Sequence, residues 1–333
     1  MKTLLPMPGL WALIATTLLA YQGPAGAATQ AQDDHRSDWL ELGGLVEIEA
    51  AYAEADGADS ESTLNVSTVE LGLVARINPM ISAEATLLYE DDGEQELSVD
   101  VAAITLLPTD NWSIVGGQFY LPFGVYESAM ISDSLTLQLG EIRETAVMVS
   151  RETGEFTTSA YLFAGDISEG GGDELDNYGL SVAYAVASGG LDFAGSAGYI
   201  NDIQDSDTIQ DAIAGPAQRA GGTYLTAVIG SGPVRLIAEY VGATGRIQTG
   251  ERPRALNLEL NYQLQILSHD ATFALGMQTS HDAAALGLAQ SAVLTAFSVG
   301  IREDTLLAFE YARAESYNGD DSGTLTAQLA VEF

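Results

Sequence analysis

Cysteine is absent from the 333-residue chain, which excludes a disulfide framework and thiol chemistry. Basic residues are scarce: Lys and Arg together number 12 against 47 Asp and Glu, and the one lysine is Lys2. Nucleic-acid binding needs a basic footprint, so this composition argues against it. The acidity is typical of a solvated surface or of a saline habitat that screens self-repulsion, and it leaves open a vestibule that attracts cations.

Long apolar runs are also missing, because no stretch approaches the roughly 18 residues of a transmembrane helix. The short apolar run at residues 10–19 lies between Lys2 and the small-x-small sequence Ala25-Gly26-Ala27. This arrangement predicts a secretory signal peptide over residues 1–27 and cleavage before Ala28. Residues 28–38 are then expected to form a short periplasmic leader.

Signatures of catalysis and metal binding are not found. The chain has no Gly-x-Ser-x-Gly motif, and the spacing of His35, His269 and His281 is not that of metal ligands. We therefore expect no enzymatic activity, no cofactor and no bound metal. One long loop contains four aspartates that could hold Ca²⁺ through oxygen ligands: Asp202, Asp205, Asp207 and Asp211. Because the full ligand spacing and the turn glycine are missing, a solvated acidic loop is the favoured interpretation.

Alternation of apolar with polar or small side chains is what the sequence does contain. Residues 325–333 alternate without a fault and end on Phe333, as a strand with one apolar face would. Similar segments recur along the chain and predict about 16 strands of roughly ten residues. They are residues 40–52, 69–77, 81–90, 97–103, 112–120, 146–151, 156–164, 178–187, 191–199, 223–231, 234–241, 255–264, 271–278, 293–301, 306–314 and 324–333.

The connections between these strands alternate in length. Links such as 166–176, 201–221 and 242–254 are long and polar, whereas Asn78-Pro79 and Gly232-Pro233 are tight turns. Long extracellular loops and short periplasmic turns are typical of outer-membrane barrels, while a β-helix or a propeller needs no such alternation. We therefore predict an all-β fold: an antiparallel up-and-down transmembrane β-barrel over residues 39–333, in the outer membrane of a Gram-negative cell. The last strand should pair with residues 40–52.

Residues 121–145 break the alternation and are too apolar for a loop in water. We predict that this third long loop folds into the lumen and narrows it; a position on the rim or at a subunit contact is the alternative. The residues expected at the constriction are Tyr120, Pro122, Phe123, Tyr126, Glu127, Asp133, Glu141, Arg143 and Glu144. Among them, Arg143 is the expected substrate-facing base.

The period of the strands also predicts which side chains face the lumen. The expected lumen wall consists of Glu47, Glu49, Glu70, Arg76, Glu84, Asp100, Arg235, Glu239, Glu259 and Glu310, with Glu41 beside them. Such an acidic wall should favour cations, and the two arginines could pair with neighbouring acids.

One set of short sequences suggests a family. Gly-Gln-Phe-Tyr-Leu-Pro-Phe-Gly at 117–124, Met-Ile-Ser-Asp at 130–133 and Leu-Gly-Glu-Ile-Arg-Glu-Thr at 139–145 resemble the legiobactin-uptake (LbtU-type) siderophore porin family. The shorter Gly-Gln-Phe-x-x-Pro-Phe-Gly pattern is also similar to segments of anion-selective and dicarboxylate-type porins. The resemblance implies a gammaproteobacterial outer-membrane barrel that passes ferric siderophore without the plug of energy-coupled receptors.

We therefore expect a passive channel for ferric siderophore. A general or small-organic-acid porin, and a non-conducting barrel with a structural or adhesive role, are the alternatives. The expected partners are outer-membrane lipid, the barrel-assembly machinery through the C-terminal strand and Phe333, and the transported solute. A homotrimer is possible by analogy with porins of this size.

Overall fold

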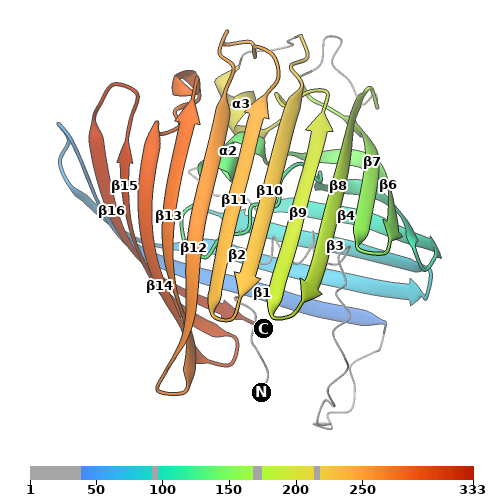
Figure 1. Ribbon diagram of the computed structural model, residues 1–333, viewed down its shortest axis with the longest axis horizontal. Helices are drawn as coiled ribbons and strands as arrows, with labels where there is room; N and C mark the ends of the chain where they lie inside the picture. The colour runs from blue at the N-terminus through green and yellow to red at the C-terminus, as the bar shows by residue number, and fades with distance from the viewer. Residues whose placement is uncertain (1–38, 92–96, 168–174, 214–217) are drawn as a thin grey trace.

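The computed structural model describes residues 39–333 except 92–96, 168–174 and 214–217. The expected signal peptide and leader lie outside these residues. The described chain is one closed antiparallel barrel of 16 strands, as the sequence predicts (Figure 1). Within the described residues, no helix is long and apolar enough to span a membrane.

The strands follow one another around the barrel in chain order. The first eight are β1 (Leu40–Ala55), β2 (Glu61–Asn78), β3 (Ile81–Glu90), β4 (Ser98–Thr109), β5 (Trp112–Tyr120), β6 (Arg143–Thr153), β7 (Phe156–Ala164) and β8 (Asn177–Ser188). The others are β9 (Leu191–Ile200), β10 (Gly222–Ser231), β11 (Val234–Ala243), β12 (Arg254–Ile266), β13 (His269–His281), β14 (Ser291–Arg302), β15 (Thr305–Glu315) and β16 (Asp321–Glu332).

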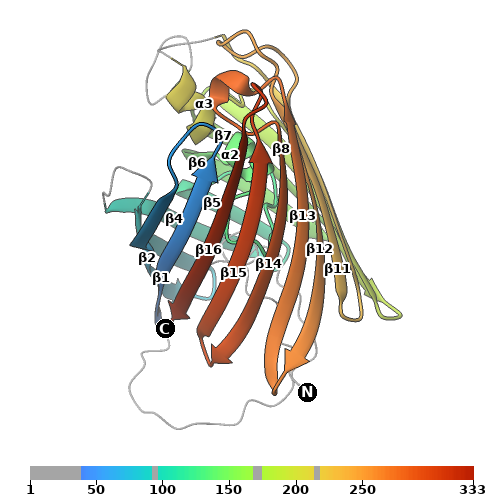
Figure 2. The same cartoon turned by 90° about the vertical axis from the view of Figure 1, so that its left-hand side faces the viewer.

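The barrel closes where β1 pairs with β16, from Leu45 opposite Glu332 to Ala55 opposite Ser322 (Figure 2). Closure leaves neither strand with an unpaired edge. Phe333 extends the pairing: its N–H donates to the Gly44 carbonyl at 3.1 Å, and its carbonyl accepts from the Gly44 N–H at 2.9 Å. The Phe333 ring lies so close to Gly44 that an added Cβ would fall 2.5 Å from the ring Cζ. The predicted partner of the last strand is therefore confirmed.

The two ends of the barrel differ in their connections. All seven even-to-odd links are two-residue turns, at 79–80, 110–111, 154–155, 189–190, 232–233, 267–268 and 303–304. Several contain residues with positive φ, such as Gly154, Gly232 and Asp304, which tight hairpins require. The longer links lie at the opposite end, where three short helices also lie (Figure 1). Short turns face the periplasm in barrels of this kind, which orients the longer links outward.

The two faces of the wall differ as period 2 requires. The outward side chains are apolar and exposed, as in Leu64, Leu162, Leu225 and Leu325. Aromatic residues are exposed near both ends of the strands, such as Tyr52 and Tyr311 at the loop end and Trp112 and Phe156 at the turn end. An apolar band between aromatic girdles is the surface that a barrel presents to lipid.

The short helices of the described residues belong to the longer links at the loop end. They are α2 (Leu135–Gly140), α3 (Asp207–Ala212) and the 3₁₀ turn η1 (Ala284–Leu286). We call residues 121–142, which join β5 to β6 and contain α2, the crossing loop. Both α2 and α3 lie within the outline of the barrel near its loop end (Figure 1). The prediction that the third long loop folds into the lumen is confirmed.

Candidate functional site

The crossing loop spans the lumen. It leaves the wall at β5 and returns to it at β6, yet its bonding partners lie on β11, β12, β13 and β15. These strands are on the far side of the 16-strand ring. Helix α2 packs against β11, β12 and β13. The loop therefore divides the lumen into two parts.

Three wall carboxylates fix this loop by accepting hydrogen bonds from its backbone. Glu239 accepts from the Val125 N–H at 2.8 Å, Glu259 from the Ala129 N–H at 2.8 Å, and Glu310 from the Ile131 N–H at 2.7 Å. These carboxylates are only 2%, 1% and 2% exposed. The crossing loop thus covers three of the acids expected to line an open lumen. Their charge is solvated by peptide N–H groups in place of water.

Side-chain hydroxyls donate further hydrogen bonds to the three acids. Ser128 donates to Glu259 at 2.6 Å, Ser132 donates to Glu310, and Thr136 donates to Glu239 at 3.0 Å. On the wall itself, Thr226 donates to Glu239 at 2.7 Å. These donors satisfy acceptor positions that burial would otherwise leave empty, which keeps the cost of burying the charges low.

Helix α2 is seated by a cap and by close packing. Ser134 caps its first turn by accepting from the Leu137 N–H at 3.2 Å, and Gln278 on β13 accepts from the Leu135 N–H at 3.0 Å. At the other end, a Cβ added at Gly140 would fall 2.5 Å from the Tyr126 hydroxyl. The Tyr126 hydroxyl itself donates to the Phe123 carbonyl.

A second cluster of hydrogen bonds holds together the two ends of the crossing loop, which we call its neck. Asp100 is the extra residue of a bulge in β4 and is 1% exposed. It accepts hydrogen bonds from the Tyr120 hydroxyl at 2.7 Å and from Arg143 at 2.9 Å. Tyr120 ends β5 and Arg143 begins β6, so Asp100 joins both stems of the loop. Arg143, the expected substrate-facing base, is 30% exposed on its side chain and is engaged by Asp100.

The part of the lumen beside β7 to β11 is filled with apolar side chains. Phe123 of the crossing loop meets Tyr224 of β10 edge to face at 5.4 Å. Ile203 and Ile209, from the loop that joins β9 to β10, complete this core and are fully buried. Glu144 on β6 is also buried, at 8% exposure. No passage for a polar solute is expected through so apolar a core.

The expectation of a solvated acidic loop after β9 is wrong for two of its four aspartates. Asp202 and Asp205 are 0% and 1% exposed. Asp202 accepts from the Ala220 N–H at 3.2 Å, and Asp205 accepts from the Ile167 N–H at 3.1 Å. Burial first, and then the charge of Asp202, raises the pKa of Asp205 to about 7. The loop folds inward together with its isoleucines. Asp202 and Asp205 are buried with it and accept hydrogen bonds from loop backbone N–H groups.

Among the residues that the structure describes, no three His, Asp or Glu side chains are grouped so that they could hold a metal ion. Asp207 and Asp211, on α3, are exposed.

The other acids predicted for the lumen lie on the side of the crossing loop away from the apolar core, or on the loop itself. Glu47 and Glu49 on β1 and Glu84 on β3 are partly exposed, as is Glu141 on the loop, and Asp133 on the loop is exposed. Glu70 on β2 is only 3% exposed. The open part of the lumen therefore lies beside β1 to β3.

Two further arginines assigned to the lumen wall have acid partners. Arg235 forms an ion pair with Glu127 of the crossing loop at 2.6 Å, and Arg76 pairs with Glu41 near the turn end of the barrel. The first pair joins wall and loop. The second lies on exposed side chains and is worth little energetically.

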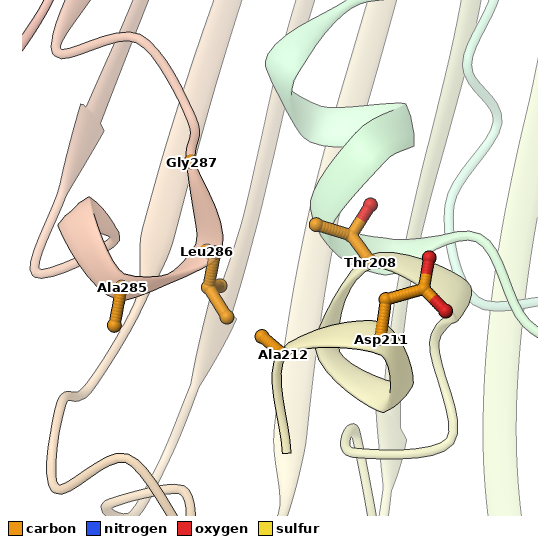
Figure 3. Close-up of a pocket in the computed structure, with 6 residues that line it drawn as sticks. All are labelled: Thr208, Asp211, Ala212, Ala285, Leu286 and Gly287. Carbon is orange, nitrogen blue, oxygen red and sulfur yellow. The ribbon is translucent and has the colours of Figure 1, made fainter. Parts of the chain in front are cut away.

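A shallow depression of about 360 Å³ opens between α3 and η1 at the loop end of the barrel (Figure 3). Its lining residues are Thr208, Asp211, Ala212, Ala285, Leu286 and Gly287. Ala212 and Leu286 extend toward one another across the gap (Figure 3). The lining offers one carboxylate and one hydroxyl, fewer convergent polar groups than a specific ligand site has.

The sequence alone did not identify Gln278 or the loop hydroxyls as anchors. Gln278 is an inward polar residue on the strand next to Glu259, so polar inward positions on neighbouring strands were an available signal. Sequence patterns could not show which loop amide binds each wall residue, because the partners are separated by 113 to 179 residues in the chain.

The fold and the site define a class: a transmembrane β-barrel with the porin fold, located in the outer membrane. Solved structures with this fold include the DcaP channel of Acinetobacter baumannii (14% identity, TM-score 0.62, 88% of this chain and 97% of that chain). OprB of Pseudomonas putida is similar at 11% identity and TM-score 0.66, over 89% and 94%. An anion-selective porin from Comamonas acidovorans matches at 13% identity and TM-score 0.60, over 88% and 99%. At such identities the likeness establishes the fold.

Sequence relatives are also found, although no family model matches the chain. A UPF0422 protein of Coxiella burnetii is 26% identical over 310 residues, which covers 84% of this chain and 66% of the relative. A UPF0422 protein of Legionella pneumophila is 23% identical over 357 residues, with 88% and 66% covered. The chain thus spans slightly less than two thirds of the length of these relatives.

Proposed function

We propose that the protein is a passive outer-membrane channel for small solutes, and that ferric siderophore is among them. The observation that carries the channel proposal is the division of the lumen by the crossing loop. One part is packed with apolar side chains, while the part beside β1 to β3 keeps water-exposed carboxylates. A barrel whose interior were wholly packed would have no reason to keep polar, exposed side chains at mid-wall.

The siderophore assignment rests on the sequence resemblance at 117–124, 130–133 and 139–145. These segments form the neck and body of the crossing loop, which is where a channel sets its selectivity. A general or small-organic-acid porin is the alternative to a siderophore channel, since the similar structures include an anion-selective porin. The other alternative is a non-conducting barrel with a structural or adhesive role. We also propose that the protein has no enzymatic activity.

Two experiments test the proposal in order. Purified refolded protein should give ion current in planar bilayers, and its absence would favour the non-conducting barrel. Cells with and without the gene are then grown on iron supplied only as a defined ferric siderophore. Faster growth with the gene supports the siderophore assignment, while equal growth leaves a general porin.

The assembly partners are part of the same proposal. The exposed Phe333 at the end of a paired strand is suited to recognition by the barrel-assembly machinery, and the apolar outer face is suited to lipid. OmpT of Vibrio cholerae, one of the similar structures at TM-score 0.55, is described in a trimer form. A homotrimer of this chain is therefore proposed, and mass measurement in mild detergent tests it.

A further inference from the structure

The inward carboxylates fall into two groups by what covers them. Glu239, Glu259 and Glu310 are at most 2% exposed, and loop donors occupy their oxygens. Glu49 on β1, in contrast, is partly exposed, and it accepts a hydrogen bond from the side-chain amide of Gln328 at 2.9 Å. The first group is covered by the crossing loop, so ions in the open passage do not contact it.

Asp133 brings a further carboxylate to the open passage from the loop side. It lies between Ser132, which bonds to Glu310, and Ser134, which caps α2, so its backbone is fixed on both sides. Its side chain is nevertheless exposed. Because the neighbouring Ser132 is held at Glu310 on β15, and only β16 separates β15 from β1 in the closed sheet, Asp133 is held on the side of the loop near β1.

Three arginines that lie on the lumen wall or at the end of the crossing loop are paired with carboxylates. Arg76 bonds to Glu41, Arg143 to Asp100 and Arg235 to Glu127. Each pair is locally neutral, so none of the three offers an unopposed positive charge to a passing anion. The passage thus has acid on its wall and acid on its loop.

From this arrangement we infer that Glu47, Glu49 and Asp133 form a cation-preferring filter in the passage between the crossing loop and β1. The wall acids Glu239, Glu259 and Glu310 position the loop and leave selectivity almost unaffected. The filter admits neutral or cationic solutes, including neutral or cationic ferric chelates, and disfavours anionic ones. The inference rests on the proposed channel function.

The expected size of the effect follows from Coulomb's law. At about 0.1 M salt, where the Debye length is about 10 Å, a unit charge about 10 Å from the permeating ions raises the local K⁺ concentration and lowers that of Cl⁻, which together change their ratio about twofold. Removal of two such charges should lower the ratio of K⁺ to Cl⁻ permeability about fourfold.

The test compares E49Q/D133N with E259Q in planar bilayers, using the zero-current potential in a KCl gradient. The double variant should lose about fourfold in permeability ratio and keep its conductance at high salt. E259Q should alter conductance or current noise with less than about a twofold change in ratio. E303Q, in the exposed turn between β14 and β15, controls for removal of one acid.

Three results would overturn the filter. They are a wild-type preference for Cl⁻, an unchanged ratio in E49Q/D133N, and a loss of selectivity in E259Q as large as in the double variant. None of these results would contradict the proposed channel function. Absence of any current from wild-type protein would instead remove the channel function and the filter together.

Discussion

Glu239, Glu259 and Glu310 illustrate how a carboxylate behaves when peptide N–H groups solvate it in place of water. An irregular loop inside a barrel carries amides that need partners, and a buried carboxylate needs donors. The hydrogen bonds between the amides and the carboxylates offset the cost of burying either group without a partner. The same residue type on β1, left open to the lumen, is free to act on passing ions.

We expect Glu310→Gln to loosen the crossing loop. Glutamine keeps the shape but replaces one acceptor oxygen with a donor, so the donors at Ile131 and Ser132 cannot all be satisfied. Each charge-assisted bond is worth about 1.5–3 kcal/mol. Hydrogen exchange of residues 128–133 should accelerate at least tenfold. Glu315→Gln, exposed on the same strand, is the control. Equal protection in both variants would show that Glu310 is not an anchor.

Asp205 should make the loop after β9 sensitive to pH. Its folded pKa of about 7 lies above the ~3.9 of a free aspartate, so the folded loop binds the extra proton between these values. Loop stability therefore falls as pH rises from about 4 to about 7, by at most about tenfold in opening equilibrium per unit, and is constant above. Hydrogen exchange of residues 203–212, compared with Asp205→Asn at each pH, measures this. A constant ratio between the two proteins would contradict it.

The crossing loop as an element sets the size of the passage. Deletion of residues 125–140 removes α2 and the backbone donors that the loop supplies to the three anchoring acids. Single-channel conductance should rise at least about twofold, because the open cross-section grows. Deletion of the exposed residues 57–60, in a loop at the same end, should leave it unchanged. Unaltered conductance after the first deletion would mean that ions do not pass beside the loop.

Strands were predictable because alternation is local, and their limits were less so. The second strand was expected from residue 69, whereas β2 begins at Glu61. Residues 61–68 are mostly polar, and their side chains are largely exposed, so both faces of this hairpin are wetted and the apolar signal fades. The inward fold of the crossing loop was predictable from its apolar composition. The burial of Asp202 was not, because one of its donors is the Ala220 N–H, 18 residues further along a loop that folds back on itself, and no local pattern encodes that contact.

Closure of the whole barrel concerns Phe333. Its removal costs two backbone hydrogen bonds with Gly44, while the register of β1 with β16 from Leu45 to Ala55 stays intact. We expect refolded protein to keep near-normal thermal stability in detergent, but the yield in the outer membrane to fall several-fold. Western blots of membrane fractions measure the yield. Phe309→Ala, another exposed aromatic, is the control. A normal yield without Phe333 would argue against recognition of this residue during assembly.

The crossing loop also has a mechanical consequence. A thin-walled cylinder flattens easily under sideways load, whereas a brace fixed at both ends of one diameter prevents it. The loop is such a brace, held at Asp100 on one wall and at Glu239, Glu259 and Glu310 on the other. Close-packed protein interiors transmit strain, so lateral pressure on β12 is felt at β5. The cross-section of this barrel should therefore stay round where its lumen is narrowest.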